Sequence, residues 1–274
     1  MKKFILGMGA QKAGTTWVHD YLNDHDNSEF GFAKEYHFFD LYAIDSLKPK
    51  QKRLISSSLR KLNGSESISE STVLHKLAWF NDPSYYFSYF ENILRNPETA
   101  VTGDLTPTYS GLPASVLNLI HKNFLDRGIE VWPIFLMRDP VDRLKSRVKM
   151  YFRKKRITPS YEEEIKLMKK LCRSEEVKVR ASYSDTYKNM REVYGENCFV
   201  GFYETLFSDA ETKRLCDIIG INHHQPNFDR KLNVSDSPNI LSENDIAYFK
   251  DIYADQYAFA GREFGSEFIG SIWR

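Results

Sequence analysis

The sequence predicts a single α/β domain with a central parallel β-sheet flanked by helices. First, short apolar runs alternate with helical patterns along the chain, which is typical of α/β architecture. Second, the run at 4–8 leads directly into a glycine-bounded loop and a helix start. Third, 274 residues are enough for one large domain with a full core. We therefore expect one domain that spans residues 1–274.

The strands are expected where apolar runs are short and bounded by turn residues. Such runs cover 3–8, 29–32, 100–104, 131–137 and 198–202. Helical periodicity predicts helices after Thr16 and over 115–125, 140–152, 161–172, 184–194, 210–219 and 243–253. Residues 41–98 and 153–182 contain no clear strand. We expect these two segments to form helical cover over the binding cleft rather than a second domain.

Composition and charge exclude several classes of protein. A formal charge of +1 gives no reason to expect nucleic-acid or membrane binding through net charge. Cys172, Cys198 and Cys216 are too few and too far apart for a disulfide framework or a zinc cluster, so they indicate buried thiols in a reducing compartment. No apolar stretch approaches the roughly 20 residues that span a bilayer. The N-terminal apolar run is interpreted as a strand rather than a signal peptide, and a cytoplasmic location without a transmembrane segment is expected.

Residues 9–17, which read GAQKAGTTW, predict a phosphate-binding loop. Gly9 and Gly14 have the spacing of a Walker A loop, but Thr15 stands where that loop has its lysine, and Lys12 lies three places earlier. Backbone N–H groups and the helix dipole of such a unit converge on an anion. The alternative is an ordinary glycine-rich turn, but such a turn needs neither a lysine nor the two consecutive hydroxyls of Thr15 and Thr16.

The loop resembles the 5′-phosphosulfate loop of the PAPS-dependent sulfotransferases, which runs Lys-x-Gly-Thr-Thr. The resemblance implies a P-loop NTPase-like sulfotransferase fold, with 3′-phosphoadenosine-5′-phosphosulfate (PAPS) as donor co-substrate and no metal. Lys12 is then the cation that stabilises charge on the leaving phosphate. The donor site implied by the resemblance contains the loop residues Gln11, Lys12, Ala13, Gly14, Thr15, Thr16 and Trp17.

A second phosphate site is predicted where the run 131–137 ends in Arg138. Asp139 followed by Pro140 is a helix start signal, so Arg138 lies at the carboxyl end of a strand and Ser146 two turns into the next helix. Arg-x7-Ser in this position resembles the sulfotransferase site for the 3′-phosphate of PAPS. A guanidinium group matches a phosphate dianion well. Alone, the motif is equally consistent with an arginine that pairs with Asp139 or Asp142.

A candidate acid–base cluster lies in residues 34–40, which read KEYHFFD and resemble a segment of the heparan-type and related bacterial sulfotransferases. Alternation puts Glu35 and His37 on the same side of an extended segment. The resemblance implies that a carboxylate here takes the acceptor's proton, with Lys34 beside the acceptor. Spacing does not decide which residue is the base; we favour Glu35, with His37 orienting the acceptor or sharing the proton. A surface Lys–Glu pair and a core histidine are the alternatives.

Weaker sites follow later in the chain. Residues 103–109 are similar to a family turn beside the acceptor, which makes Asp104 and Tyr109 candidate substrate-binding residues. Asp104 equally fits a residue that supports the site from behind or simply forms the turn. Tyr183 and Lys231 occupy places where family members contact the nucleotide, but the residue after Lys231 is not the glycine of the family pattern.

Taken with the resemblance, the residues predict transfer of a sulfuryl group from PAPS to a hydroxyl or amine of an acceptor. The acceptor is a small molecule, glycan or lipid that the sequence does not identify, and the oligomeric state stays open. One rival is a P-loop kinase of a small metabolite, for which the Walker lysine is absent and Asp104 is the only candidate magnesium ligand at a strand end. Another is a non-catalytic nucleotide-binding module, against which Lys12, Glu35 and His37 argue.

Overall fold

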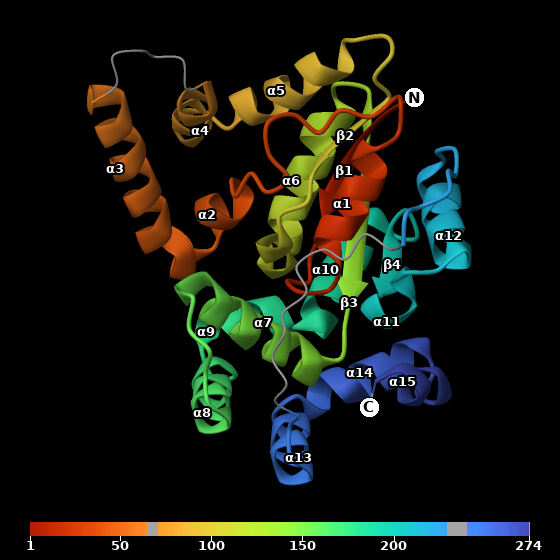
Figure 1. Cartoon of the computed structure of the whole chain (residues 1–274). Coiled ribbons are helices and arrows are strands. Elements are labelled where there is room, and N and C mark those ends of the chain that lie inside the picture. The colour runs from red at the N-terminus through yellow and green to blue at the C-terminus, as the bar shows by residue number, and fades with distance from the viewer. Residues whose placement is uncertain (65–70, 229–239, 274) are drawn as a thin grey trace.

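The computed structural model describes residues 1–64, 71–228 and 240–273. A parallel four-stranded sheet forms its centre (Figure 1). The strands are β1 (Lys2–Gly7), β2 (Val101–Asp104), β3 (Ile129–Met137) and β4 (Phe199–Phe202), in the order β2-β1-β3-β4. Phe4 of β1 is in register with Thr102 on one side and Val131 on the other. The sheet confirms the predicted α/β fold class with a central parallel sheet.

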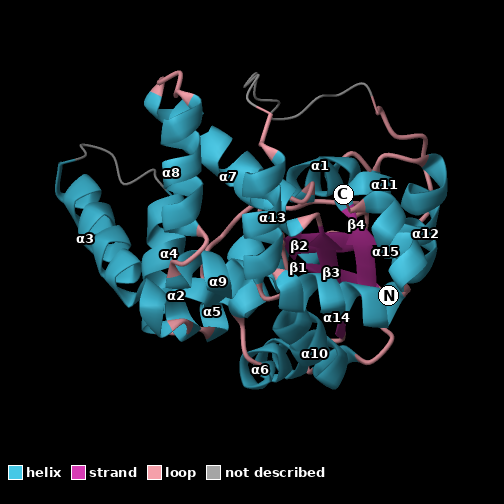
Figure 2. Cartoon of the chain, turned by 90° about the horizontal axis from the view of Figure 1, so that it is seen from below, coloured by secondary structure: helices cyan, strands magenta, loops and turns pink. Residues whose placement is uncertain are grey.

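Helices cover both faces of the sheet. Figure 2 shows α1 (Thr15–Asn23) and α11 (Tyr203–Leu206) on one side, and α6 (Ala114–Leu125) and α10 (Tyr183–Tyr194) on the other. Such a sheet is buried on both faces, and its central strands therefore read as continuous apolar runs. In β1, Phe4, Ile5 and Leu6 are fully buried. The helix α12 (Asp209–Ile219) contacts β4 at the edge.

The two segments without predicted strands are helical where they are described. Residues 41–98 contain α3 (Lys48–Gly64), α4 (Ser71–Asn81) and α5 (Ser84–Leu94), and 153–182 contain α8 (Tyr161–Leu171) and α9 (Glu175–Ala181). The short α2 (Phe39–Ala43) and the 3-10 helices η1 (Asp45–Leu47) and η2 (Pro107–Gly111) border the same region. After α13 (Glu243–Ile252) come two helices that the sequence did not predict, α14 (Ala254–Phe264) and α15 (Ser266–Ile272).

The expectation of a strand at 29–32 is wrong. Only Ser28 pairs with the sheet, through an isolated parallel bridge to Val101, and the chain then turns. Gly31 adopts a φ of 73°, and its N–H donates to the Glu29 carboxylate over 2.7 Å. A residue in the left-handed conformation ends an extended strand, and glycine adopts this conformation without steric cost. The turn buries Phe30 in the core all the same, which is why its pattern resembled that of a strand.

Two further features follow from composition. Cys172, Cys198 and Cys216 are buried free thiols, as predicted. Among the helices that the structure describes, none is long and apolar enough to cross a membrane.

Candidate functional site

The phosphate loop connects β1 to α1 and requires glycine at both ends. Gly9 has a φ of 82°, and Gly14, the N-cap of α1, has a φ of 90°. A Cβ on Gly14 would lie 2.6 Å from Cδ2 of Leu206, so no side chain fits there. No side chain caps α1 either, which leaves its first-turn N–H groups directed at the loop. Because the helix dipole adds a positive potential, this terminus suits an anion.

Lys12 lies in the middle of this loop with a left-handed φ of 73°. Burial, together with the positive charges of Arg153, Arg138 and Arg147, lowers the pKa of Lys12 from 10.5 to about 8. The ammonium group is therefore crowded by other cations in the free protein. A bound anion would relieve that repulsion and hold Lys12 in its charged form.

Arg138 lies at the carboxyl end of β3, next to the phosphate loop. Its Nη1 donates to the Lys12 carbonyl over 3.2 Å, and its guanidinium carbon lies 4.1 Å from the centre of the Tyr203 ring. Its buried Nε has no hydrogen-bond partner among the described residues. A buried guanidinium N–H without a partner is costly, and a phosphate oxygen would satisfy it.

The helix that follows Arg138 begins as the sequence predicts. Asp139 caps α7 (Pro140–Lys155), accepting from the N–H groups of Val141 and Asp142. Ser146 is half-buried on the second turn of α7. Tyr183 is buried and donates to the Arg138 carbonyl over 2.7 Å, so in this structure it holds Arg138 in place.

Trp17 forms part of an aromatic stack that sequence reasoning missed. Its ring is nearly parallel to Tyr21, at 5.6 Å between centroids, and to Phe228, at 5.9 Å. A cavity of about 260 Å³ lies beside Trp17 and Tyr21. Phe228 comes from a segment more than 200 residues away, and no local pattern signals it. Lys231, the predicted nucleotide contact that follows it, lies outside the described residues.

Glu35 and His37 are brought together, although their segment is a loop rather than a strand. Glu35 Oε2 lies 3.3 Å from His37 Nε2, and His37 Nδ1 donates to Asp40 Oδ2 over 2.8 Å. Asp40 is fully buried and was not singled out from the sequence. His37 therefore lies between two carboxylates.

These neighbours push the two pKa values in opposite directions. Burial alone would raise the pKa of Glu35, but the hydrogen bond from His37 and the charge of Lys34 outweigh it and lower the pKa to about 2. Burial alone would lower the pKa of His37, but hydrogen bonds to Asp40 and Glu35 raise it to about 9. At neutral pH, Glu35 is ionised and His37 is protonated.

Lys34 links this acid–base cluster to the phosphate loop. Its Nζ lies 2.8 Å from Glu35 Oε1 and donates to the Thr15 hydroxyl over 3.2 Å. Thr15 and Lys34 are 19 residues apart in sequence, and the two motifs therefore share one hydrogen-bonded cation.

Asp104 and Tyr109 are fully buried beneath the loop and do not line the cavity described below. Asp104 Oδ1 accepts from the Tyr36 N–H and the Thr106 hydroxyl. Asp104 Oδ2 accepts from the Tyr86 and Tyr109 hydroxyls over 2.9 and 2.6 Å. Burial raises the pKa of Asp104 to about 6, against the effect of these donors. In this structure Asp104 anchors the loop between Glu35 and His37 through the Tyr36 N–H.

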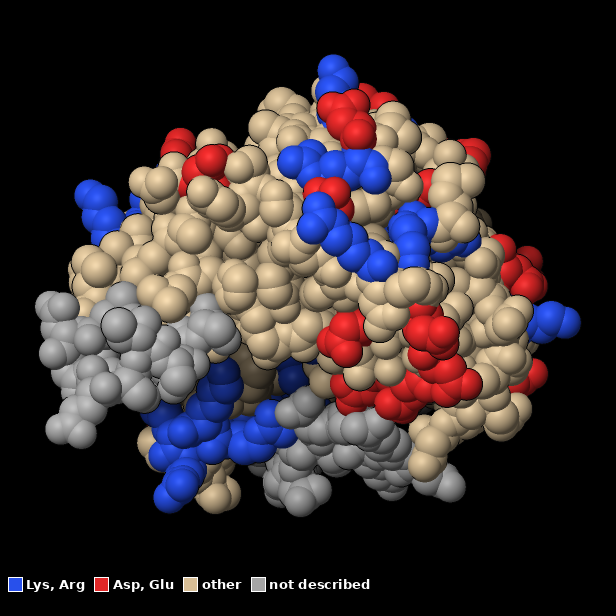
Figure 3. All heavy atoms as spheres, turned by 90° about the horizontal axis from the view of Figure 1, so that it is seen from above, with Lys and Arg blue, Asp and Glu red and all other residues tan. Residues whose placement is uncertain are grey.

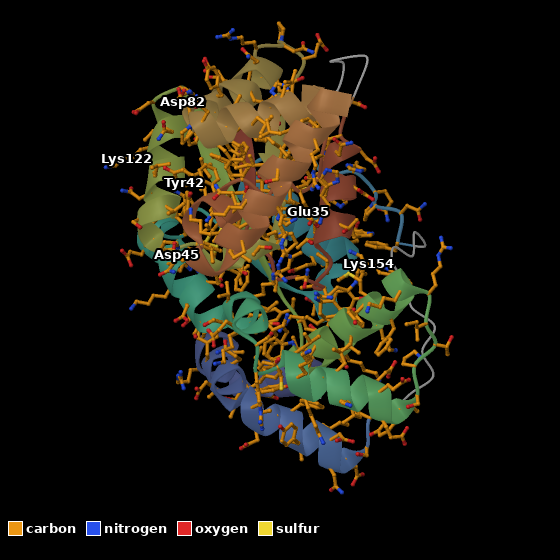
Figure 4. The ribbon with its side chains drawn as sticks, turned by 90° about the vertical axis from the view of Figure 1, so that its left-hand side faces the viewer. Glu35, Tyr42, Asp45, Asp82, Lys122 and Lys154 are labelled. Carbon is orange, nitrogen blue, oxygen red and sulfur yellow. The ribbon has the colours of Figure 1, made fainter. Side chains whose placement is uncertain are left out.

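A cavity of about 390 Å³ lies in front of Glu35 and His37. Its walls include Gln11 of the phosphate loop, Pro107 and Thr108 of η2, and residues of α3, α7 and α9. Figure 4 shows Glu35 near the centre of the view, with Lys154 of α7 toward one side and Lys122 of α6 at the opposite edge. The arrangement places a carboxylate, a protonated imidazole and a phosphate loop around one space.

Comparisons with known proteins bear on the fold and on the family of the chain. The fold resembles a sulfotransferase from Alicyclobacillus acidocaldarius (16% identity, 96% of this chain and 95% of that chain covered, TM-score 0.58). A second match is the sulfotransferase domain of the Synechococcus PCC 7002 olefin synthase (14% identity, 94% of each chain covered, TM-score 0.44). The comparison with curated proteins found no match. The family model described as "Sulfotransferase family" matches residues 4–225, most of the chain. The chain therefore belongs to the sulfotransferase family, a family of enzymes that use PAPS.

Proposed function

We propose that this protein transfers the sulfuryl group of PAPS to a hydroxyl or amine of an acceptor, with Lys12 and Glu35 carrying the chemistry. The observation that supports the proposal most is that Gln11 of the phosphate loop lines the same cavity as Glu35 and His37. Lys34 adds a direct link between the loop and Glu35. A donor at the loop and an acceptor in the cavity would then meet beside a carboxylate.

The residues present fit PAPS. The uncapped start of α1 with Lys12, Thr15 and Thr16 suits the phosphosulfate, and the orphaned Nε of Arg138, with Ser146, suits the 3′-phosphate. The Trp17 ring would hold the adenine base, and Tyr183 would keep Arg138 in position. When bound, PAPS supplies the sulfuryl group: its S–O bond to the 5′-phosphate breaks, and a bond from sulfur to the acceptor oxygen or nitrogen forms. No metal is needed for this chemistry.

Glu35 is the proton acceptor in this scheme. His37, with its pKa near 9, already carries its proton at neutral pH, whereas Glu35, with its pKa near 2, is a carboxylate. A carboxylate of such low pKa is a weak base toward a free hydroxyl. It therefore takes the proton late, once the forming bond to sulfur has made the acceptor O–H or N–H acidic. His37 holds the carboxylate in place, and Asp104 and Tyr109 hold the loop that carries both.

Lys12 supplies electrostatic stabilisation. The bridging oxygen gains negative charge as the S–O bond breaks, and a preorganised ammonium group beside it lowers the barrier. The kinase alternative is weakened because Asp104, its candidate magnesium ligand, is fully buried and already accepts from four donors.

The test compares two matched variants in an assay with labelled PAPS. Glu35→Gln keeps the shape of the side chain but removes the proton acceptor, so turnover should fall by about 10²–10⁴-fold. The affinity for the product 3′-phosphoadenosine-5′-phosphate (PAP) should stay within a few-fold, and PAP should raise Tm without magnesium. His37→Gln should cost less in kcat and more in acceptor KM. If Glu35→Gln stays active while His37→Gln is inactive, His37 is the proton acceptor and Glu35 is its partner. Stabilisation by ATP with magnesium, and none by PAP, would favour a kinase.

A further inference from the structure

We propose that the acceptor is an organic anion of about one ring in size, a hydroxyl- or amine-bearing molecule or residue with a carboxylate, sulfate or phosphate group. The proposal rests on the proposed function and names its substrate class. The cavity in front of Glu35 carries a concentrated positive charge. Five basic side chains line that cavity, Lys50, Arg147, Lys154, Lys155 and Arg180, and Glu35 is the only carboxylate among its lining residues.

This concentration of positive charge is local. The whole chain is almost neutral, with a formal charge of +1. On the face shown in Figure 3, Lys and Arg side chains gather around a hollow, while Asp and Glu side chains gather on a neighbouring surface. Crowded like charges repel one another: burial is the main cause of the lowered pKa of Lys12, and the charges of Arg147 and Lys154 from this cavity add to it. An anionic ligand would offset that cost.

Donor binding does not account for all of these cations. The donor's two anionic groups are matched by the phosphate loop with Lys12 and by Arg138 with Ser146. Lys50 comes from α3 and Arg180 from α9, which are separate elements from the loop and from the start of α7. The charge of Lys50 opposes protonation of His37, so its field acts on the acid–base cluster. These cations therefore surround the place where the acceptor must lie.

The volume of the cavity and its other lining residues restrict the class of acceptor that it can hold. A volume of about 390 Å³ is near the lower end of small-molecule pockets, which range over roughly 300–1,000 Å³. Pro107, Met150 and Tyr151 give the cavity apolar surface, and Lys155 lies 4.7 Å from the centre of the Tyr151 ring. A ring packed on this surface would present an anionic substituent to the lysines. An acidic sugar unit or an aryl acid has this chemistry.

Matched probes that differ only in charge test the proposal. Calorimetry on the full protein saturated with PAP would compare 4-hydroxybenzoate with its methyl ester, and galacturonate with its methyl ester. The aryl pair tests an aryl acid as the acceptor, and the sugar pair tests an acidic sugar unit. The acid should bind about tenfold more tightly than its ester in at least one pair, as expected for one or two well-placed ion pairs.

A double variant identifies the cations responsible. Lys50→Gln with Lys154→Gln changes two exposed cavity lysines and should reduce the preference for the acid at least several-fold, while ester binding and PAP affinity stay within about threefold. Lys122→Gln, on the exposed face of α6 at the opposite edge of Figure 4, is the control and should leave the preference unchanged.

Three results would overturn the inference. Equal binding of acid and ester in both pairs, or no binding of either acid, would show that the cavity does not select anions. A loss of PAP affinity in the double variant as large as its loss of acid binding would assign these lysines to the donor. Failure of the wild-type protein to bind PAP is a different result, because it would remove the proposed function itself.

Discussion

Replacing Asp40 by Asn should lower the pKa of His37 and shift the pH dependence of the enzyme. Asp40 is fully buried, its Oδ2 accepts from His37 Nδ1 over 2.8 Å, and its Oδ1 accepts from the Leu41 N–H over 2.9 Å. Asn keeps the shape and the bond from Leu41. Its amide nitrogen then faces Nδ1 of His37 and donates to it, which favours the neutral imidazole.

The magnitude follows from the pKa of His37. A rise from 6.5 to about 9 corresponds to roughly 3 kcal/mol between the two protonation states, at about 1.4 kcal/mol per unit of pKa. Asp40 and Glu35 share this effect, and Asp40 is the more buried partner with the shorter contact. We therefore expect the variant to have a His37 pKa of about 7 or lower.

The sign of the stability change is set by the same shift. His37 has a higher pKa in the folded protein than in the unfolded chain. Its ion pairs therefore stabilise the fold fully below pH 6.5, and this contribution is lost as the pH rises through 9. A fall in the His37 pKa from about 9 to about 7 should cost about 2–3 kcal/mol near pH 6 and almost nothing near pH 10.

Proton NMR of the imidazole C2–H resonances measures the pKa directly, and His37→Gln identifies the resonance by its absence. The alkaline limb of kcat/KM that belongs to His37 should move from near pH 9 toward neutrality in Asp40→Asn. A His37 pKa that stays within about 0.3 of the wild-type value would refute the assignment of Asp40 as the partner that keeps His37 charged.

Three further predictions concern the donor site. Gly14→Ala places a methyl group 2.6 Å from Leu206 at a φ of 90°, so it should cost about 2–4 kcal/mol in denaturant unfolding. Gly128→Ala, at a φ of 70° with open space around it, should cost about 1 kcal/mol, and equal losses would contradict the close packing at Gly14. Arg138→Ala should weaken the binding of PAPS by about tenfold or more in calorimetry. The binding of adenosine 5′-phosphosulfate, which lacks the 3′-phosphate, should be almost unchanged. Equal losses of affinity for the two ligands would remove the assignment of Arg138 to the 3′-phosphate. Lys12→Ala should lower kcat by about 10²–10³-fold with saturating PAPS, and near-normal turnover would exclude its electrostatic role.

Local sequence determined the features that depend on local sterics and on burial. The apolar runs of the central strands predicted a sheet covered on both faces, and the structure has that sheet. The spacing of Gly9 and Gly14 predicted a tight loop, and both adopt left-handed conformations that other residues avoid. Asp139 before Pro140 marked the start of α7, because a capping carboxylate and a residue without an N–H suit a helix N-terminus wherever it lies.

Tertiary structure decided whatever depends on residues that meet from distant parts of the chain. The run at 29–32 has the apolar pattern of a strand, but the only bridge to the sheet there is at the preceding residue, Ser28, because Gly31 turns the chain away. The sequence left open whether Asp104 contacts the acceptor, supports the site or forms a turn, and only the packing of Tyr86 and Tyr109 around it shows a buried anchor. Burial and contact distances are properties of the folded chain, so no local motif encodes them.

The charges of the site also depend partly on the sequence and partly on the tertiary structure. Sequence placed Glu35 and His37 side by side but left open which one is the base. The buried Asp40 and the approach of Lys34 separate their pKa values, so that one is ionised and the other protonated at neutral pH. Likewise, a net charge of +1 hides the cavity where Lys50 and Arg180 converge with the basic end of α7. Net charge is a sum over the whole chain, whereas a ligand responds to the few charges that folding brings within ångströms of it.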